Sequence, residues 1–268
     1  MGSSEPALVP GDVVDAPPPG REQWLFTDRR IAGVTFRGLA DAWGWLQFRN
    51  CAFVECTFER CEVNWRFGGR GFEQDAASWI SASRFVRCDL RQFKVAYGGV
   101  EGSVFENCRW DFPNFLRNTD LISNRFIGIV RRLIILGQDD TPPGEMSQPR
   151  ARANVIRGND FRAADLRELE LRNGVPVEDQ LWPEGPNCGV IDRYPERMEI
   201  LLSQLQGRDD NEAKRWRIWL STLAIHHGPA TQQQSTWERW DDPSKNAIWN
   251  GVLAALAAHA QAEHHRPR

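Results

Sequence analysis

The sequence lacks any apolar run near the ~18 to 20 residues that a membrane-spanning helix needs, so we expect no transmembrane segment. Its first residues include no basic segment followed by an apolar one, so we expect no secretory signal. Four catalytic or nucleotide-binding motifs are also missing: G-x-S-x-G, the P-loop, H-E-x-x-H and G-x-G-x-x-G. We therefore predict a cytoplasmic protein without a cofactor that is not an enzyme. An enzyme, or an accessory subunit of one, with a site in the C-terminal helices is the alternative.

The chain also lacks a clear excess of either positive or negative charge. The chain of 268 residues has a net charge of -3, and residues 21–175 contain 23 Lys and Arg against 20 Asp and Glu. A nucleic-acid-binding domain normally has a strong basic excess. Direct binding of nucleic acid is therefore not expected.

What the sequence does contain is a repeat with a period of five between Phe48 and Val63. Large apolar residues recur every five positions, and a cysteine stands two positions before three of them. This period fits neither the 3.6 residues of a helical turn nor the alternation of a strand. A chain that buries a side chain every five residues must turn a corner each time, and four corners make a coil of about twenty residues. The residues of this run are Phe48, Cys51, Phe53, Cys56, Phe58, Cys61 and Val63.

The coil of twenty residues is visible directly in a second run. The segment SRFVRCDL begins at Ser83 and SVFENCRW begins at Ser103, twenty positions later. Phe85 then matches Phe105, and we expect such pairs to stack in adjacent coils. The predicted core consists of Phe48, Phe53, Phe58, Phe85, Leu90, Phe105, Trp110, Phe161 and Leu166.

These repeats resemble the pentapeptide-repeat proteins, whose loose pattern is Ala-Asp/Asn-Leu/Phe-X-X. Ala164, Asp165 and Leu166 match it letter for letter, and the resemblance covers roughly residues 31–172. It implies a mainly β fold, a right-handed quadrilateral β-helix (a solenoid), followed here by a small α-helical C-terminal domain. The best-known members bind DNA gyrase or topoisomerase IV, and some extrude loops and dimerise through C-terminal helices. The resemblance therefore implies a protein partner.

Three regions are expected along the chain. Residues 1–20 are rich in proline and glycine and are predicted to be a disordered tail. Residues 21–175 form the repeat domain, in which changes of phase indicate inserted loops near 37–47, 64–80 and 137–153. Residues 176–268 are predicted to be a linker and an α-helical domain for capping and dimerisation.

The C-terminal region shows helical periodicity after residue 190. Apolar residues from Met198 to Leu205 share one face, Asp209 or Asp210 can cap a second helix, and a third follows Asp242. Trp237 and Trp240 also stand at helical spacing. The apolar stripe and alanine-rich face of the last helix predict a possible homodimer.

The cysteines of the repeat could bind a metal ion or could pack in the core as small apolar side chains. Structural zinc sites place two cysteines two to four residues apart, whereas Cys51, Cys56 and Cys61 are five apart and would face different walls of the coil. We therefore expect buried, reduced thiols and no metal.

The inserts are the predicted binding sites, because functional residues gather on loops that a rigid scaffold holds. The alternative is that each insert is a harmless bulge. We expect the partner to be a protein, and we expect this chain to act as a toxin antagonist or as a scaffold. Protection of a topoisomerase is the second candidate, although mimicry of DNA requires an acidic surface that the charge count does not indicate. The predicted binding residues are Trp65, Arg66, Phe67, Arg70, Phe72, Asp139, Asp140 and Glu145.

Overall fold

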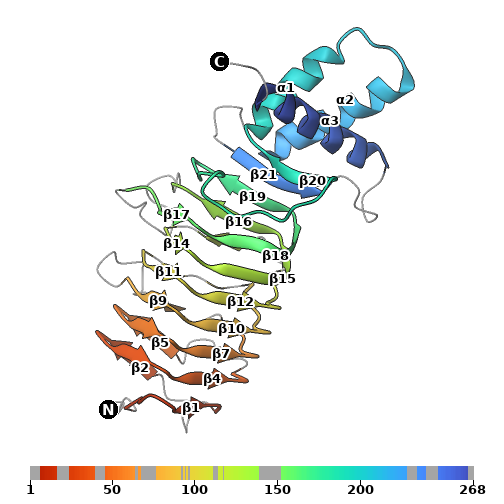
Figure 1. The fold of residues 1–268 in the computed structure, drawn as a ribbon. Coiled ribbons are helices and arrows are strands. Elements are labelled where there is room, and N and C mark those ends of the chain that lie inside the picture. The colour runs from red at the N-terminus through yellow and green to blue at the C-terminus, as the bar shows by residue number, and fades with distance from the viewer. Residues whose placement is uncertain are drawn as a thin grey trace.

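The chain folds into parallel β-sheets followed by three helices, as a computed structural model shows (Figure 1). The strands stack along the length of the molecule, with the N-terminal strands at one end and the helices at the other. The structure describes residues 7–16, 24–39, 46–63, 66–67, 77–91, 93, 95, 97–110, 114–116, 118–138, 152–227, 234–239 and 247–264.

Two long sheets run the length of the stack. The seven-stranded sheet contains β1 (Val13–Val14), β4 (Thr35–Arg37), β7 (Thr57–Glu59), β10 (Arg84–Val86), β12 (Val104–Glu106), β15 (Arg125–Arg131) and β18 (Asp160–Arg167). The six-stranded sheet contains β3 (Arg30–Ala32), β6 (Ala52–Val54), β9 (Trp79–Ser81), β11 (Gly99–Glu101), β14 (Asp120–Ile122) and β17 (Ile156–Arg157).

Two shorter sheets and the helices complete the fold. The three-stranded sheet contains β2 (Trp24–Thr27), β5 (Leu46–Arg49) and β8 (Arg66–Phe67). The five-stranded sheet contains β13 (Asn114–Leu116), β16 (Leu133–Leu136), β19 (Leu169–Arg172), β21 (Gln234–Arg239) and β20 (Cys188–Ile191). The helices are α1 (Tyr194–Gln204), α2 (Asn211–His227) and α3 (Ala247–His264).

Consecutive strands of the stack belong to different sheets, and each pairs in parallel with the strand one turn of the chain later. Ile31 of β3 lies opposite Phe53 of β6, and Phe36 of β4 lies opposite Phe58 of β7. Both pairs are 22 residues apart and each is buried. The apolar residues spaced by five therefore occupy neighbouring sheets, and the same position in the next turn stacks on each of them.

Corners with left-handed backbone explain the period of five. Asn50, Glu55 and Arg60 have φ of 50°, 55° and 51°, and each follows a short strand directly. A strand of three residues and a corner of two add up to five. Asparagine tolerates this backbone region, whereas glutamate and arginine adopt it at a cost that the packed stack must offset.

A column of stacked rings fills the inner side of the seven-stranded sheet. The ring centroids of Phe85 and Phe105 are 4.8 Å apart, those of Phe105 and Phe126 are 5.0 Å apart, and the planes differ by 13° and 14°. The column continues to Phe161, on which Trp182 stacks at 5.2 Å. All nine residues predicted for the core are buried.

A ladder of buried polar side chains runs beside the rings. The backbone N–H of Ser103 donates to Oδ1 of Asn124 at 3.0 Å, and the N–H of Asn124 donates to Oδ1 of Asn159 at 3.1 Å. Nδ2 of Asn124 also donates to the carbonyl of Val100 at 2.9 Å. These bonds satisfy backbone groups at the corners, which otherwise would be buried without partners.

The thiols of the repeat lie in the interior and are reduced. Cys51, Cys56, Cys61, Cys88 and Cys108 are free and buried, whereas Cys188 is half-buried. A hydrogen bond with the thiol of Cys108, together with burial, raises the pKa of Cys88 to about 12. The neighbouring thiol of Cys88 and burial raise the pKa of Cys61 further. Thiolate, the reactive form, is therefore suppressed in this column.

We predict that only Cys188 among the six cysteines reacts quickly with Ellman's reagent in the native protein. All six should react after denaturation, because unfolding restores ordinary thiol pKa values and access. Counting the released chromophore in buffer and in guanidinium measures both numbers. Fast reaction of two or more thiols in buffer would contradict the buried column, and the variant Cys188→Ser, which should show no fast reaction, is the control.

The N-terminal tail predicted to be disordered contains a strand. Val13 and Val14 form β1, which pairs in parallel with Thr35 and Phe36 of β4. Val14 is buried, and the N–H of Gly11 donates to the carbonyl of Gly33 at 2.9 Å. Residues 13–14 thus extend the seven-stranded sheet by one strand, since they cover an edge that β4 would otherwise leave unpaired.

The C-terminal region is not only helical, because it adds two antiparallel strands. β21 pairs with β19, and β20 pairs with β21, so Trp237 belongs to a strand and not to the helix that its spacing from Trp240 indicated. Trp237 is buried in the core of the stack. Helix α2 begins where predicted, since Oδ1 of Asp210 accepts the N–H of Ala213 at 2.9 Å.

Candidate functional site

The candidate site is a row of outward-facing residues on the six-stranded sheet. Trp79, Gly99 and Asp120 lie opposite one another on β9, β11 and β14, which are adjacent strands. The residues that follow them in sequence, Ile80 and Val100 among them, are buried in the core. Because side chains alternate along a strand, Trp79 and Asp120 lie on the outer face.

Gly99 makes room for the indole of Trp79. A Cβ atom at Gly99 would lie 2.6 Å from Cζ3 of Trp79 and 2.9 Å from Cβ of Asp120. Both contacts are shorter than side chains tolerate, so only glycine fits between these two residues. The indole therefore lies against Gly99 of β11, and Trp79 remains half-buried.

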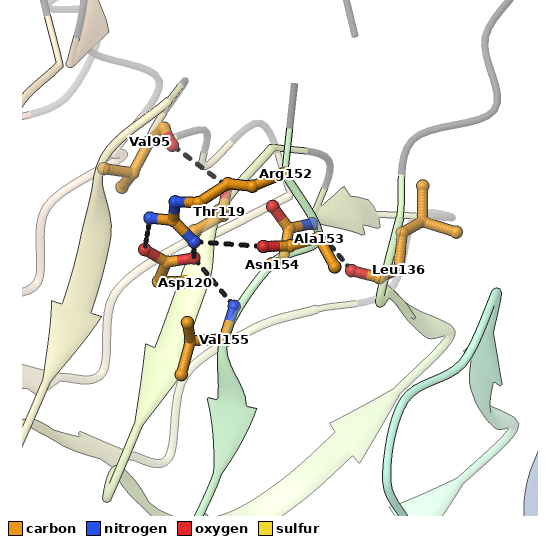
Figure 2. A network of polar contacts seen from close by, with 8 residues as sticks. All are labelled: Val95, Thr119, Asp120, Leu136, Arg152, Ala153, Asn154 and Val155. Carbon is orange, nitrogen blue, oxygen red and sulfur yellow. Dashed lines mark hydrogen bonds and ion pairs between the residues drawn. The ribbon is translucent and has the colours of Figure 1, made fainter. Parts of the chain in front are cut away.

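Asp120 is 1% exposed, and its carboxylate accepts hydrogen bonds from Arg152 and from the backbone of Val155 (Figure 2). Nη1 and Nη2 of Arg152 donate to its two oxygens at 3.1 and 2.6 Å, and the N–H of Val155 donates to Oδ1 at 2.8 Å. A buried carboxylate without such partners would be strongly unfavourable. The same pair raises the pKa of Arg152 through its hydrogen bond with Asp120, so the guanidinium stays charged.

Two further bonds fix the residues on either side of this ion pair. Oγ1 of Thr119 donates to the carbonyl of Val95 at 2.9 Å, and Nδ2 of Asn154 donates to the carbonyl of Leu136 at 2.8 Å (Figure 2). Thr119 and Asn154 are buried. The backbone before β14 and before β17 is thus tied to the interior, which holds Asp120 and Arg152 in place.

Small and apolar residues surround the row. Ala52, Val54 and Ile122 occupy outer positions of the same sheet and are half-buried, while Arg30 and Arg157 at its ends are exposed. An indole together with arginines is typical of the residues that contribute most to protein–protein binding.

Most of the predicted binding residues lie outside the described residues. Trp65, Arg70, Phe72, Asp139, Asp140 and Glu145 belong to this group. Arg66 and Phe67 form β8, in which Phe67 lies opposite Phe48 of β5, so they continue a sheet instead of opening a loop.

The connections between strands are shorter than the first two predicted inserts, and the third runs from residue 137 to 155, slightly beyond the predicted 137–153. The first lies between Leu39, which is buried, and Leu46 of β5. The second and third connect β8 to β9 and β16 to β17. Both of these enter the six-stranded sheet, directly before Trp79 and around Arg152, so the row lies where the two inserts rejoin the stack.

Two features of the sequence are weak indications of this row. Gly98 and Gly99 are adjacent where a strand is expected, and glycine within a strand often marks a close approach. Asp120 precedes an inward Leu121, as in the family pattern, and looks like an ordinary repeat residue. Its ion pair with Arg152, 32 residues later, has no signature in the sequence.

The described residues contain no candidate metal centre. They contain no group of three His, Cys, Asp or Glu side chains that could hold a metal ion. His226 and His227 end α2, and their side chains lie outside the described part. Among the described helices, none is long and apolar enough to cross a membrane.

Known proteins give no further identification of the chain. Comparison with models of protein families and with curated proteins found no match to this sequence.

Proposed function

We propose that this chain is a non-catalytic protein-binding scaffold that uses the outer face of the six-stranded sheet around Trp79. In this proposal the repeat domain is a right-handed quadrilateral β-helix of the pentapeptide-repeat kind. The partner is a protein, and the chain acts on it as a toxin antagonist or as a scaffold for an assembly. The observation that carries the proposal is the row of Trp79, Gly99, Asp120 and Arg152, which the strand pairing and the Asp120–Arg152 ion pair hold together.

The pattern of strand pairing supports the fold part of the proposal. The chain visits the seven-stranded, six-stranded and shorter sheets in a repeating order, and isolated bridges join Glu62, Asp89 and Arg109 on a further side. Leu90 and Trp110, next to these bridges, are buried. Four stacks around one core are what a quadrilateral coil requires.

The rigidity of the row supports the binding part. Trp79 is wedged over Gly99, and Arg152 is held by a buried carboxylate, so neither side chain has much freedom to lose on binding. Side chains that are ordered before binding give more affinity per contact. An indole of this kind is a typical anchor of a protein interface.

The charges on other faces favour a generic protein partner over protection of a topoisomerase by DNA mimicry. Arg37 pairs with Glu59 at 3.1 Å, and Arg84 pairs with Glu106 at 3.0 Å, each across adjacent strands. Such pairs cancel the acidic field that an imitation of duplex DNA needs. The same cancellation removes the basic field that direct binding of nucleic acid needs.

A homodimer through the C-terminal helices stays a prediction. Val252, Leu253 and Leu256 of α3 are buried in a core shared with Met198 of α1 and Leu220 of α2, so the apolar stripe is already used within one chain. Ala254 and Ala255 are half-buried on the remaining surface. Light scattering of the protein with and without residues 243–268 measures the oligomeric state.

We predict that Trp79→Ala weakens binding of the partner by at least about thirtyfold, or about 2 kcal/mol. The partner is first captured from the native host on the immobilised protein, identified by mass spectrometry, and purified. Its Kd for the wild type and the variant is then measured by calorimetry. The loss should be large because the indole is the largest apolar group on the proposed surface.

Arg84→Ala is the matched control, because Arg84 is exposed on β10, the next strand of the same turn but on a different sheet. It should leave the Kd within about twofold. If Arg84→Ala weakens binding and Trp79→Ala does not, the proposed face is wrong. If no protein is retained above a denatured control, the proposed function is wrong.

A further inference from the structure

Arg152 has donors left over after all of its observed hydrogen bonds are counted. A guanidinium has five N–H groups. Nη1 donates to Asp120 and to the carbonyl of Ala153, and Nη2 donates to Asp120 (Figure 2). The N–H of Nε and the second N–H of Nη2 have no partner in the described part of the chain. These two lie on the same edge of the planar group and point the same way.

In other arginines of the stack, the Nε and Nη2 atoms donate to a carboxylate on the same strand. Nε and Nη2 of Arg162 both donate to Asp160, at 2.9 Å each. Arg167 binds Asp165 with the same two atoms. In these pairs the carboxylate two residues earlier occupies the edge. Arg152 instead binds Asp120 through the end formed by Nη1 and Nη2, which leaves its Nε edge open.

The open edge is fixed in position and accessible. Asp120 is 1% exposed, and its two oxygens hold the guanidinium from behind, while the side chain of Arg152 is 53% exposed. A bidentate pair of this kind restricts rotation of the guanidinium about its own plane. Asp120 therefore acts as a positioning residue for a second ligand of Arg152.

Other charges on the same face favour an anion. Arg30 and Arg157 are exposed and have no ion pair within the described part of the chain. Among the described residues of this sheet, Glu101 is the exposed acidic residue between them. Since the charge of Asp120 is buried and paired with Arg152, the accessible charge of the described part of this face is positive.

We propose that the Nε and Nη2 edge of Arg152 binds the carboxylate of an acidic side chain on the protein partner. The carboxylate would accept two parallel hydrogen bonds, beside the indole of Trp79. This inference rests on the proposed function and names the chemistry that the partner brings to the row. Lysine could not replace Arg152, because an ammonium group cannot form the planar pair.

The test is a titration of the free protein at low salt, in which NMR of the arginine Nε–H groups monitors binding. The probe is the peptide acetyl-Gly-Glu-Gly-amide. Spectra of Arg152→Lys and Arg162→Lys assign the two resonances by their disappearance. The Arg152 resonance should shift progressively over peptide concentrations on the order of tens to hundreds of millimolar, because a single exposed ion pair contributes little binding free energy.

Three comparisons decide the outcome. The peptide acetyl-Gly-Gln-Gly-amide at equal ionic strength should leave Arg152 unmoved, and the Glu peptide should leave Arg162 unmoved because Asp160 occupies its edge. Asp120→Asn, with folding checked by circular dichroism, should weaken the titration several-fold. Parallel shifts at Arg152 and Arg162, or no shift at Arg152, would overturn the inference. A partner whose binding depends on Trp79 would still uphold the proposed function in that case.

Discussion

Replacing Phe105 by alanine should destabilise the protein by about 3–5 kcal/mol. Phe105 is 2% exposed and stands in the middle of the ring column, between Phe85 at 4.8 Å and Phe126 at 5.0 Å. The strands that carry the neighbouring rings are hydrogen-bonded to its own, so they cannot move inward to fill the space. The free energy of unfolding from urea titration measures the loss.

Val104→Ala is the control for this prediction. Val104 is adjacent in sequence, points outward and is half-buried, so its loss should cost under about 1 kcal/mol. Equal effects of the two substitutions would show that the column does not contribute more than any strand residue. A cost below about 2 kcal/mol for Phe105→Ala would show that the stack relaxes around the hole.

The stacked β architecture was predictable because inward positions are set by local geometry. The large buried residues of an uninterrupted turn recur every five positions, so the pattern appears in any short window of sequence. The match between SRFVRCDL and SVFENCRW indicated a turn of twenty residues, and Phe85 does lie opposite Phe105 in adjacent strands. The N–H of Ser83 also donates to Oγ of Ser103 at 3.1 Å, a hydrogen bond that the sequence match did not specify. Stacking repeats the same environment and therefore the same residue types.

The strands outside the repeats were not predictable, because their pairing depends on edges formed elsewhere. β1 has only two residues, Val13 and Val14, and forms because β4 offers an open edge. β21 pairs with β19 although Trp237 comes 68 residues after Leu169 in the sequence. Trp237 resembles a helical residue locally, and tertiary pairing overrides that preference.

The site was less predictable than the fold, because its residues come from different turns. Phase breaks located the inserts, and the row lies where two of them rejoin the six-stranded sheet. The importance of Trp79 depends on Gly99 one turn later, and that of Arg152 depends on Asp120. Trp79 and Gly99 are one regular turn of twenty residues apart, but only the packed structure shows that the indole covers the glycine. Asp120 and Arg152 are 32 residues apart because the third insert separates them, so the repeat does not predict their contact.

The second large effect should come from Gly98, which stands next to this row. A Cβ atom at Gly98 would lie 1.7 Å from the carbonyl oxygen of Ser78 and 2.7 Å from its carbon. Both belong to backbone, so no change of rotamer can relieve the clash. Gly98 is also a hydrogen-bond acceptor for the N–H of Asp120 at 3.0 Å. A shift of this segment would therefore disturb the candidate site as well as the stack.

We predict that Gly98→Ala costs about 3 kcal/mol or more in the free energy of unfolding, because the backbones of β9 and β11 must separate. Gly102→Ala is the matched control: its φ is +58° and a Cβ there meets nothing within 4 Å, so backbone strain alone should cost about 1 kcal/mol. Urea titration of the two variants measures the difference. The fluorescence of Trp79, isolated by comparison with Trp79→Phe, should also change in Gly98→Ala and not in Gly102→Ala. Two variants of equal stability would mean that Ser78 and Gly98 are not in close contact, and the position of Trp79 over Gly99 would then lose its structural basis.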